Sequence, residues 1–135
     1  MNVMTIEQLR EIEYREMTEE QHQIRLFEEL DKMAVKHPEL LDCTHIPNGG
    51  YRPKKTGATM RQSGVKPGFP DIFLPVARKG RHGLFVELKS VKKSAKVSLV
   101  QQIVMLRLID YGYEAVVCYG WEEAYKAIIS YLEGE

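Results

Sequence analysis

Residues 68–74, Gly-Phe-Pro-Asp-Ile-Phe-Leu, and residues 84–89, Leu-Phe-Val-Glu-Leu-Lys, lie on either side of a basic turn that contains glycine. In the second segment the aliphatic residues alternate with Phe85, Glu87 and Lys89, which is the period of two of a half-buried β-strand. The two segments therefore predict a β-hairpin that presents Glu87 and Lys89 on one face.

The turn brings a second carboxylate towards Glu87. Reflection of the hairpin about Gly80 sets Asp71 opposite Lys89 and diagonal to Glu87. Diagonal neighbours have Cβ atoms roughly 7 Å apart, so both carboxylates can reach one cation at Mg–O distances of about 2.0–2.1 Å. A solvated strand face is the alternative interpretation, because Glu-x-Lys is common on outer strands.

Three features favour the metal site over a solvated face: a proline at the start of the first arm, hydrophobic neighbours around both carboxylates, and a Ser-x-x-Gln that opens the next helical segment. Together these motifs resemble the VRR-NUC family, a branch of the PD-(D/E)xK nuclease superfamily, in the form of a small, stand-alone phage or bacterial member. The motifs are Gly68-x-Pro70-Asp71, Glu87-Leu88-Lys89 and Ser98-x-x-Gln101. The resemblance spans about residues 18–132 of a single domain, 1–135, with residues 1–17 as an N-terminal helical extension.

The resemblance implies a structure-specific DNA endonuclease that uses Mg²⁺ or Mn²⁺ held by Asp71, Glu87, the Leu88 carbonyl and a helix-borne acid. Such an ion lowers the pKa of a bound water and offsets charge on the phosphate. Lys89 would orient or deprotonate the attacking water, and a plain salt bridge is its structural alternative. Gln101 is expected to hydrogen-bond a phosphate or a water, the alternative being a helix-surface amide.

The helix-borne acid has two candidates. Thr18 and Gln21 form a capping box that predicts a helix start at this point. VRR-NUC proteins resemble one another here in a Ser/Thr-Glu-x-x-x-Gln pattern, which Thr18, Glu19 and Gln23 match. Glu19 is therefore the expected acid, with Glu20 as the alternative. Either glutamate could instead serve only the helix dipole.

Residues 47–67 form a long loop with four Gly, three Pro, five basic residues and no acid, and one helical turn is expected near 58–62. The family resembles this chain in a Pro-Asn-Gly-Gly-x-Arg-like element at this place. We therefore expect the loop to contact DNA phosphates. The expected contacts are Asn48, Arg52, Lys54, Lys55, Arg61 and Lys66.

Charge is segregated along the chain although the formal net charge is zero. Residues 1–31 carry nine acids and three bases, whereas residues 43–96 carry twelve bases and only two acids, Asp71 and Glu87. A basic field around two carboxylates suits a site that attracts a phosphate backbone, the alternative being a basic, solvated loop region. No apolar run is long enough to span a membrane and no signal pattern opens the chain, so we expect a cytoplasmic protein of a phage or its bacterial host.

The remaining segments predict helices that flank a mixed sheet, in the order α-α-β-β-β-α-β-α, an α/β fold with a restriction-endonuclease-like core. The second helix is expected to run from residue 18 to about 36 and to bury a stripe of Ile24, Phe27, Leu30 and Ala34. The helix that begins at Ser98 is expected to bury Val100, Ile103, Val104, Leu108 and Ile109. A parallel crossover joins the Glu87 strand to a strand at 115–119.

The first expected helix, residues 5–16, is acidic and has apolar residues at helical spacing. Stand-alone VRR-NUC proteins resemble Holliday-junction resolvases, which are homodimers that cut four-way junctions. Residues 5–16 are therefore a candidate for part of a dimer interface, with simple core packing as the alternative. Two other functions stay open: a flap or single-strand nuclease of the same fold, and a non-catalytic DNA-binding assembly factor.

Overall fold

The computed structural model describes residues 3–47, 59 and 61–134. Within these residues, the elements with complete bounds are four helices, one 3-10 helix and four strands, in the expected order. They are α1 (Ile6–Glu16), α2 (Glu19–Met33), η1 (Pro38–Asp42), β1 (Thr44–His45), β2 (Ile72–Leu74), β3 (Leu84–Lys89), α4 (Leu99–Asp110), β4 (Glu114–Tyr119) and α5 (Trp121–Glu133). The expected α/β fold with a mixed sheet is confirmed.

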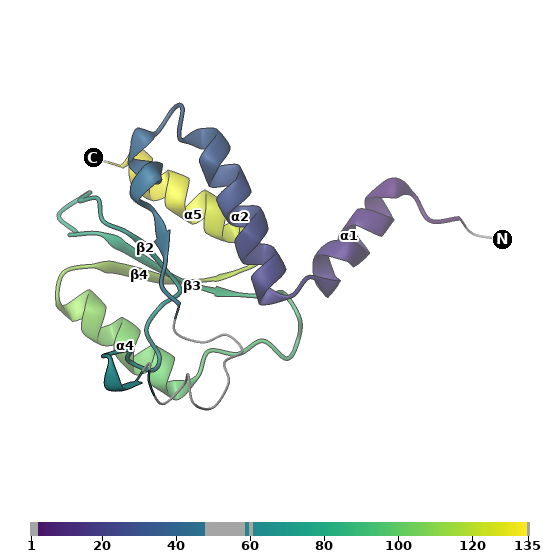
Figure 1. Ribbon diagram of the computed structural model, residues 1–135. Helices are drawn as coiled ribbons and strands as arrows, with labels where there is room; N and C mark the ends of the chain where they lie inside the picture. The colour runs from purple at the N-terminus through teal and green to yellow at the C-terminus, as the bar shows by residue number, and fades with distance from the viewer. Residues whose placement is uncertain (1–2, 48–58, 60, 135) are drawn as a thin grey trace.

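The sheet has the strand order β1-β2-β3-β4, with the first two pairs antiparallel and β3–β4 parallel. Helices α2 and α5 cover one face and α4 covers the other (Figure 1). All six residues of β3 are buried, so the expectation of a half-buried strand is wrong. The alternation itself persists, since Val86 packs beneath α2 and α5 while Phe85 packs beneath α4.

The register of the hairpin differs from the expected one. Ile72 pairs with Val86, so one step further along the same register Asp71 lies across from Glu87, and not across from Lys89. The two carboxylate-bearing residues are therefore direct rather than diagonal neighbours, which brings their side chains closer than expected.

The turn explains this difference. Lys79 and Gly80 both have positive φ, and they form a two-residue turn closed by hydrogen bonds between Arg78 and Arg81. The turn is thus centred between residues 79 and 80 rather than on Gly80. The first arm also contains the irregular segment 75–77, which begins with a proline that cannot donate to a ladder and adds one residue that the second arm lacks.

Helix α2 begins at the expected capping box of Thr18. It buries His22, Leu26 and Leu30, whereas Ile24 is 54% exposed, so the expected stripe through Ile24 is wrong. A polar residue, His22, occupies the buried line because its Nδ1 accepts a hydrogen bond from the backbone N–H of Trp121 at the start of α5 (3.1 Å).

Helix α4 also begins at its expected cap, Ser98. It buries Val104, Met105 and Leu108 against the sheet, but Val100 and Ile103 are about half exposed. The helix carries apolar residues on more than one face, so its sequence alone could not identify the face that meets β3 and β4.

Helix α1 stands apart from the rest of the protein (Figure 1). None of its residues is buried, so the expectation of simple core packing is wrong. It meets the body through Tyr14, whose hydroxyl accepts from the backbone N–H of Glu122 (3.3 Å) and whose ring lies edge-on to His22. Within the described ranges, no helix combines the length and the apolar character that a membrane crossing requires.

A pair of alanine variants tests the packing of α2. We expect Leu26→Ala to lower the free energy of unfolding by about 2–5 kcal/mol, because it leaves a cavity in the core beneath α2 and α5. Ile24→Ala, on the exposed side of the same helix, should change the stability by no more than about 0.5 kcal/mol. Urea denaturation of both variants measures this, and equal losses would contradict the packing.

Candidate active site

Five residues expected to form the site lie together at one end of β3. Asp71 comes directly before β2, and Glu87 and Lys89 lie in the last half of β3. The first turn of α4 contributes Gln101, and the first turn of α2 contributes Glu19. The site is thus built from the ends of two strands and the N-terminal turns of two helices.

Asp71 is held at both its side chain and its backbone. Its Oδ2 accepts a hydrogen bond from the backbone N–H of Leu88 at 2.8 Å. Its carbonyl oxygen accepts from the backbone N–H of Ile46 at 2.6 Å and contacts Nδ1 of His45 at 2.9 Å. The ring nitrogen must be the donor in that contact because a carbonyl can only accept.

His45 also lies beside the site, although no sequence motif assigned it there. It lies in β1, where it pairs with Ile72, the residue after Asp71. The signal that could have revealed it is the short segment 42–46 next to the hairpin, because an added antiparallel strand brings its side chains to the hairpin's open edge.

Glu87 carries a buried carboxylate that is only 1% exposed. Its Oε1 accepts from the Gln101 amide at 3.0 Å and lies 3.7 Å from Lys89 Nζ. Its Oε2 is buried without a hydrogen-bond partner among the residues that the structure describes. The pKa of Glu87 is raised to about 8: burial is the largest cause, the charge of Asp71 and a side-chain hydrogen bond with it act in the same direction, and Lys89 acts in the opposite one.

Gln101 has a helix-capping role and a site role at once. Its Oε1 accepts from the backbone N–H of Ser98 at 2.9 Å, which completes the capping box of α4. This bond directs the amide nitrogen to Glu87, to which it donates. Gln101 is therefore fixed at the site by the same interaction that begins the helix, and it is not a free surface amide.

Lys89 lies between two carboxylates and is 8% exposed. Its Nζ is 3.7 Å from Glu87 Oε1 and 3.9 Å from Glu19 Oε1. Burial raises the pKa of Glu19, with Lys89 lowering it and Asp71 raising it. The ammonium group therefore links the acid on α2 to the acid on β3.

The geometry of α2 separates the two candidate glutamates. At about 100° per residue, Glu19 lies roughly 20° from the buried Leu26, whereas Glu20 lies roughly 120° away. Glu19 contacts Lys89, and Glu20 is exposed and forms no ion pair within the described part of the chain. The contact favours Glu19 as the helix-borne acid.

The donor set suits a divalent cation, although no three His, Cys, Asp or Glu side chains within residues 3–47, 59 and 61–134 are grouped closely enough to hold one. Asp71 and Glu87 lie on adjacent strands, and the buried Oε2 of Glu87 has no donor among the described residues. An unsatisfied buried oxygen is costly, and oxygen ligands are what Mg²⁺ and Mn²⁺ prefer. The residues present therefore fit such an ion.

The expected DNA-contact residues fall into two groups. Arg61 and Lys66 are exposed in the segment that leads to β2. The other four, Asn48, Arg52, Lys54 and Lys55, lie outside the described residues. Thr59, Arg61 and Gln62 are helical, which agrees with the turn expected near 58–62.

The raised pKa of Glu87 makes a prediction for stability. Without metal, folded Glu87 binds its proton more tightly than the unfolded chain, so the free energy of unfolding should fall as pH rises from about 4.5 to about 8. Gln does not titrate. Between about pH 6 and about pH 9, the free energy of unfolding of Glu87→Gln should therefore fall by roughly 2–3 kcal/mol less than that of the wild type. Urea unfolding in chelator measures it, with the exposed Glu20→Gln as control. Equal pH slopes in wild type and Glu87→Gln would contradict the assignment.

Comparisons with known proteins agree on one family. The VRR-NUC domain model matches residues 14–122. A solved structure described as a VRR_NUC domain protein superposes with a TM-score of 0.73 at 26% sequence identity, covering 87% of this chain and 89% of that chain. A search of curated proteins returned no match. VRR-NUC proteins are generally nucleases that depend on a divalent metal, and the family match extends over most of the fold and the whole of the site described above. The chain belongs to the VRR-NUC family.

Proposed function

We propose that the chain is a Mg²⁺- or Mn²⁺-dependent endodeoxyribonuclease that hydrolyses phosphodiester bonds in branched DNA. The observation that carries this proposal is the buried Glu87 carboxylate, which meets Asp71, Lys89 and Gln101 at one end of β3. Two carboxylates beside a lysine suit phosphodiester hydrolysis, because they can hold a cation while the lysine handles a proton.

Asp71, Glu87 and the Leu88 carbonyl would hold the metal ion, with Glu19 as a further ligand. The Leu88 N–H donates to Asp71, and in an extended strand the N–H and C=O of one residue point to the same edge, so its carbonyl is directed to the edge of β3 beside Asp71. A bound divalent ion would supply Lewis-acid activation of water and neutralisation of phosphate charge. Hydrogen bonds from Leu88 and Gln101 orient the two carboxylates before any ion arrives.

Lys89 is the residue we assign to the attacking water. Its ammonium lies between Glu87 and Glu19, at ion-pair distances that are longer than a hydrogen bond. The two carboxylates therefore position the ammonium and leave its N–H groups available to a water. From there Lys89 can orient a water or stabilise negative charge on the phosphate, and in its neutral amine form it can accept a proton from the water. Gln101 keeps Glu87 in place and can donate to a phosphate oxygen if Glu87 turns to the metal.

The basic segment provides the attraction for DNA. Residues 43–96 carry twelve of the nineteen basic residues of the chain. We assign the phosphate contacts to Asn48, Arg52, Lys54, Lys55, Arg61 and Lys66. Because such contacts are largely independent of base sequence, the protein should select DNA by shape.

The preferred substrate that we propose is a four-way junction, cut by a homodimer in the cytoplasm. A four-way junction has approximate two-fold symmetry and needs two incisions, whereas each chain supplies one site. A dimer with two-fold symmetry would present two sites and join two basic segments into one surface.

A pair of variants separates the proposed roles of the site residues. Lys89→Met keeps the buried aliphatic stem but removes the ammonium, so we expect Mn²⁺ binding to persist while cleavage falls by at least about 100-fold. Asp71→Asn should weaken Mn²⁺ binding itself, because a neutral amide is a poorer ligand for a hard cation. Calorimetric titration and a nicking assay measure the two effects, with the exposed Lys126→Met as control.

Cleavage by Lys89→Met at the wild-type rate would remove Lys89 from the mechanism. Unchanged Mn²⁺ affinity in Asp71→Asn would place the metal elsewhere. If the wild-type protein binds DNA but makes no nicks with either metal, the chain is a non-catalytic DNA-binding assembly factor.

Substrate choice is tested with four-way junctions, flaps, single strands and linear duplexes of equal length. We expect paired, symmetric incisions in the four-way junction with Mg²⁺ or Mn²⁺, and little cutting of the duplex. Gel analysis with each strand labelled in turn reports the positions of the cuts. Cleavage of flaps or single strands with intact junctions would contradict the junction preference and leave the nuclease chemistry standing.

A further inference from the structure

Helix α1 has an apolar tip that its own chain does not cover. The exposed fractions of the large apolar side chains in this part of the chain are 82% for Val3, 55% for Met4, 68% for Ile6 and 53% for Leu9. The helix projects away from the sheet and from the other helices (Figure 1). An isolated helix of 11 residues is only marginally stable in water, even with the capping box that Thr5 provides. These features indicate that α1 gains stability by packing its exposed apolar side chains against another surface.

The match to the family model begins at residue 14, so most of α1 lies outside the matched range. The nuclease site does not use residues 6–13, and they lie on the far side of α2 from α4 (Figure 1). Their packing therefore needs an explanation other than catalysis.

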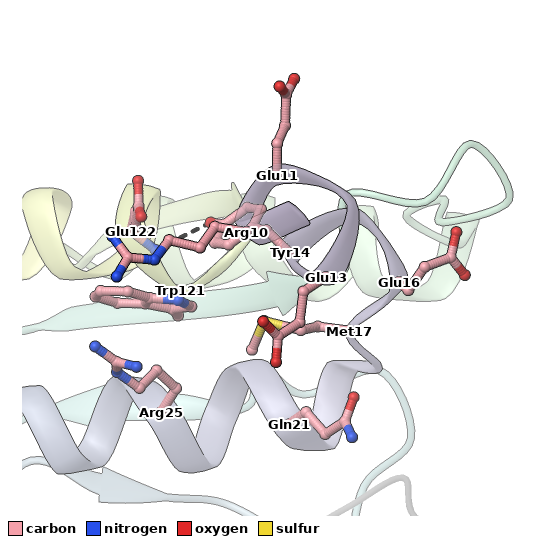
Figure 2. Close-up of a pocket in the computed structure, with 10 residues that line it drawn as sticks. All are labelled: Arg10, Glu11, Glu13, Tyr14, Glu16, Met17, Gln21, Arg25, Trp121 and Glu122. Carbon is pink, nitrogen blue, oxygen red and sulfur yellow. Dashed lines mark hydrogen bonds between the residues drawn. The ribbon is translucent and has the colours of Figure 1, made fainter. Parts of the chain in front are cut away.

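One line of side chains along α1 faces an open cleft of about 1030 Å³ between α1 and the body. Arg10 and Glu13 of α1 and its C-cap residue Met17 line this cleft, together with Glu11, Tyr14 and Glu16. Figure 2 shows the Glu13 carboxylate directed into the cleft and Glu11 pointing away from it. Ile6 continues the same line, because residues 6, 10, 13 and 17 fall within about 60° of one another on a helix. Their spacing of four, three and four is that of a helix-packing seam.

This seam is complementary to itself when it is reversed. It runs apolar, basic, acidic, apolar, as Ile6, Arg10, Glu13 and Met17. In an antiparallel pair of such helices, Ile6 of one copy faces Met17 of the other, and Arg10 faces Glu13. Each contact occurs twice, as a two-fold axis requires. Within the described residues neither Arg10 nor Glu13 forms an ion pair, so both charges are available.

We propose that two copies of the chain associate through their α1 helices, each α1 lying antiparallel to the other along the cleft. The opposite wall of the cleft adds Gln21 and Arg25 of α2, and Trp121 and Glu122 of α5. Trp121 already stacks under Arg25, at 4.8 Å from the guanidinium carbon to the ring centroid, and offers a large, rigid surface. The α1 seam and this wall together form the contact surface for the second copy.

This surface would form the dimer of the proposed function, so the role of the interface in DNA cleavage rests on that function. The proposed site residues Asp71, Glu87, Lys89, Gln101 and Glu19 are not among the residues that line the cleft. The measurement below reports mass and not cleavage, so a failure of the interface and a failure of the nuclease are distinguishable.

Charge reversal provides the test. Arg10→Glu sets two Glu–Glu contacts across the axis, and Glu13→Arg sets two Arg–Arg contacts, so each variant alone should dimerise at least roughly tenfold more weakly than wild type. The double variant Arg10→Glu/Glu13→Arg should dimerise again. An equimolar mixture of the two single variants should form a heterodimer, because every Glu then faces an Arg. Sedimentation velocity at micromolar concentrations measures all four.

Arg15→Glu is the matched control, since it makes the same charge change about 140° around the same helix, and it should leave dimerisation unchanged. Circular dichroism verifies that all variants keep their helices. A monomeric wild type overturns the proposal. So do single variants that dimerise like wild type, or a mixture and a double variant that both stay monomeric.

Discussion

Glu87 carries an ionisable carboxylate into the interior of the protein, and the rest of the site is arranged around that burial. A buried carboxylate needs hydrogen-bond donors or a cation, and its charged form is otherwise disfavoured. Gln101 donates to one oxygen, Lys89 lies close to the same oxygen, and the second oxygen has no donor within the described residues. The raised pKa of Glu87 is the measurable consequence. A divalent cation would reverse it by favouring the ionised form.

Helix starts supply the partners that Glu87 needs. Ser98 and Gln101 form a capping box at the start of α4, and the bond that closes the box also aims the Gln101 amide at Glu87. Thr18 begins α2 in the same way and places Glu19 one residue later, within reach of Lys89. Local backbone chemistry at two helix ends thus positions side chains that lie far apart in sequence.

Helix α1 differs from α2 and α4 because none of its residues is buried. Helix α1 contacts the body through Tyr14, whose hydroxyl accepts from the backbone N–H of Glu122 at the start of α5 and whose ring lies edge-on to His22. This attachment fixes where the helix begins to leave the body but buries none of its residues. Stability of the core therefore depends on β3 and the helices that cover it, whereas α1 is free to serve contacts outside the chain.

Local interactions explain what could be predicted from sequence. The capping box at Thr18, the helix start at Ser98, the alternation in β3 and the order of elements depend on neighbours a few residues apart, and each was predicted correctly. The residues Asp71, Glu87, Lys89, Gln101 and Glu19, taken from sequence motifs, lie together in the structure, while their roles remain proposals.

Tertiary structure alone decided three other features. The irregular segment 75–77 and the turn at Lys79 set Asp71 across from Glu87. Packing against β3 and α5 buried His22 in place of Ile24. His22 Nδ1 accepts from the Trp121 N–H, whereas its Nε2 has no hydrogen-bond partner among the described residues. The pairing of β1 with β2 brought His45 to Asp71, a contact between residues 26 positions apart that depends on how the strands pair.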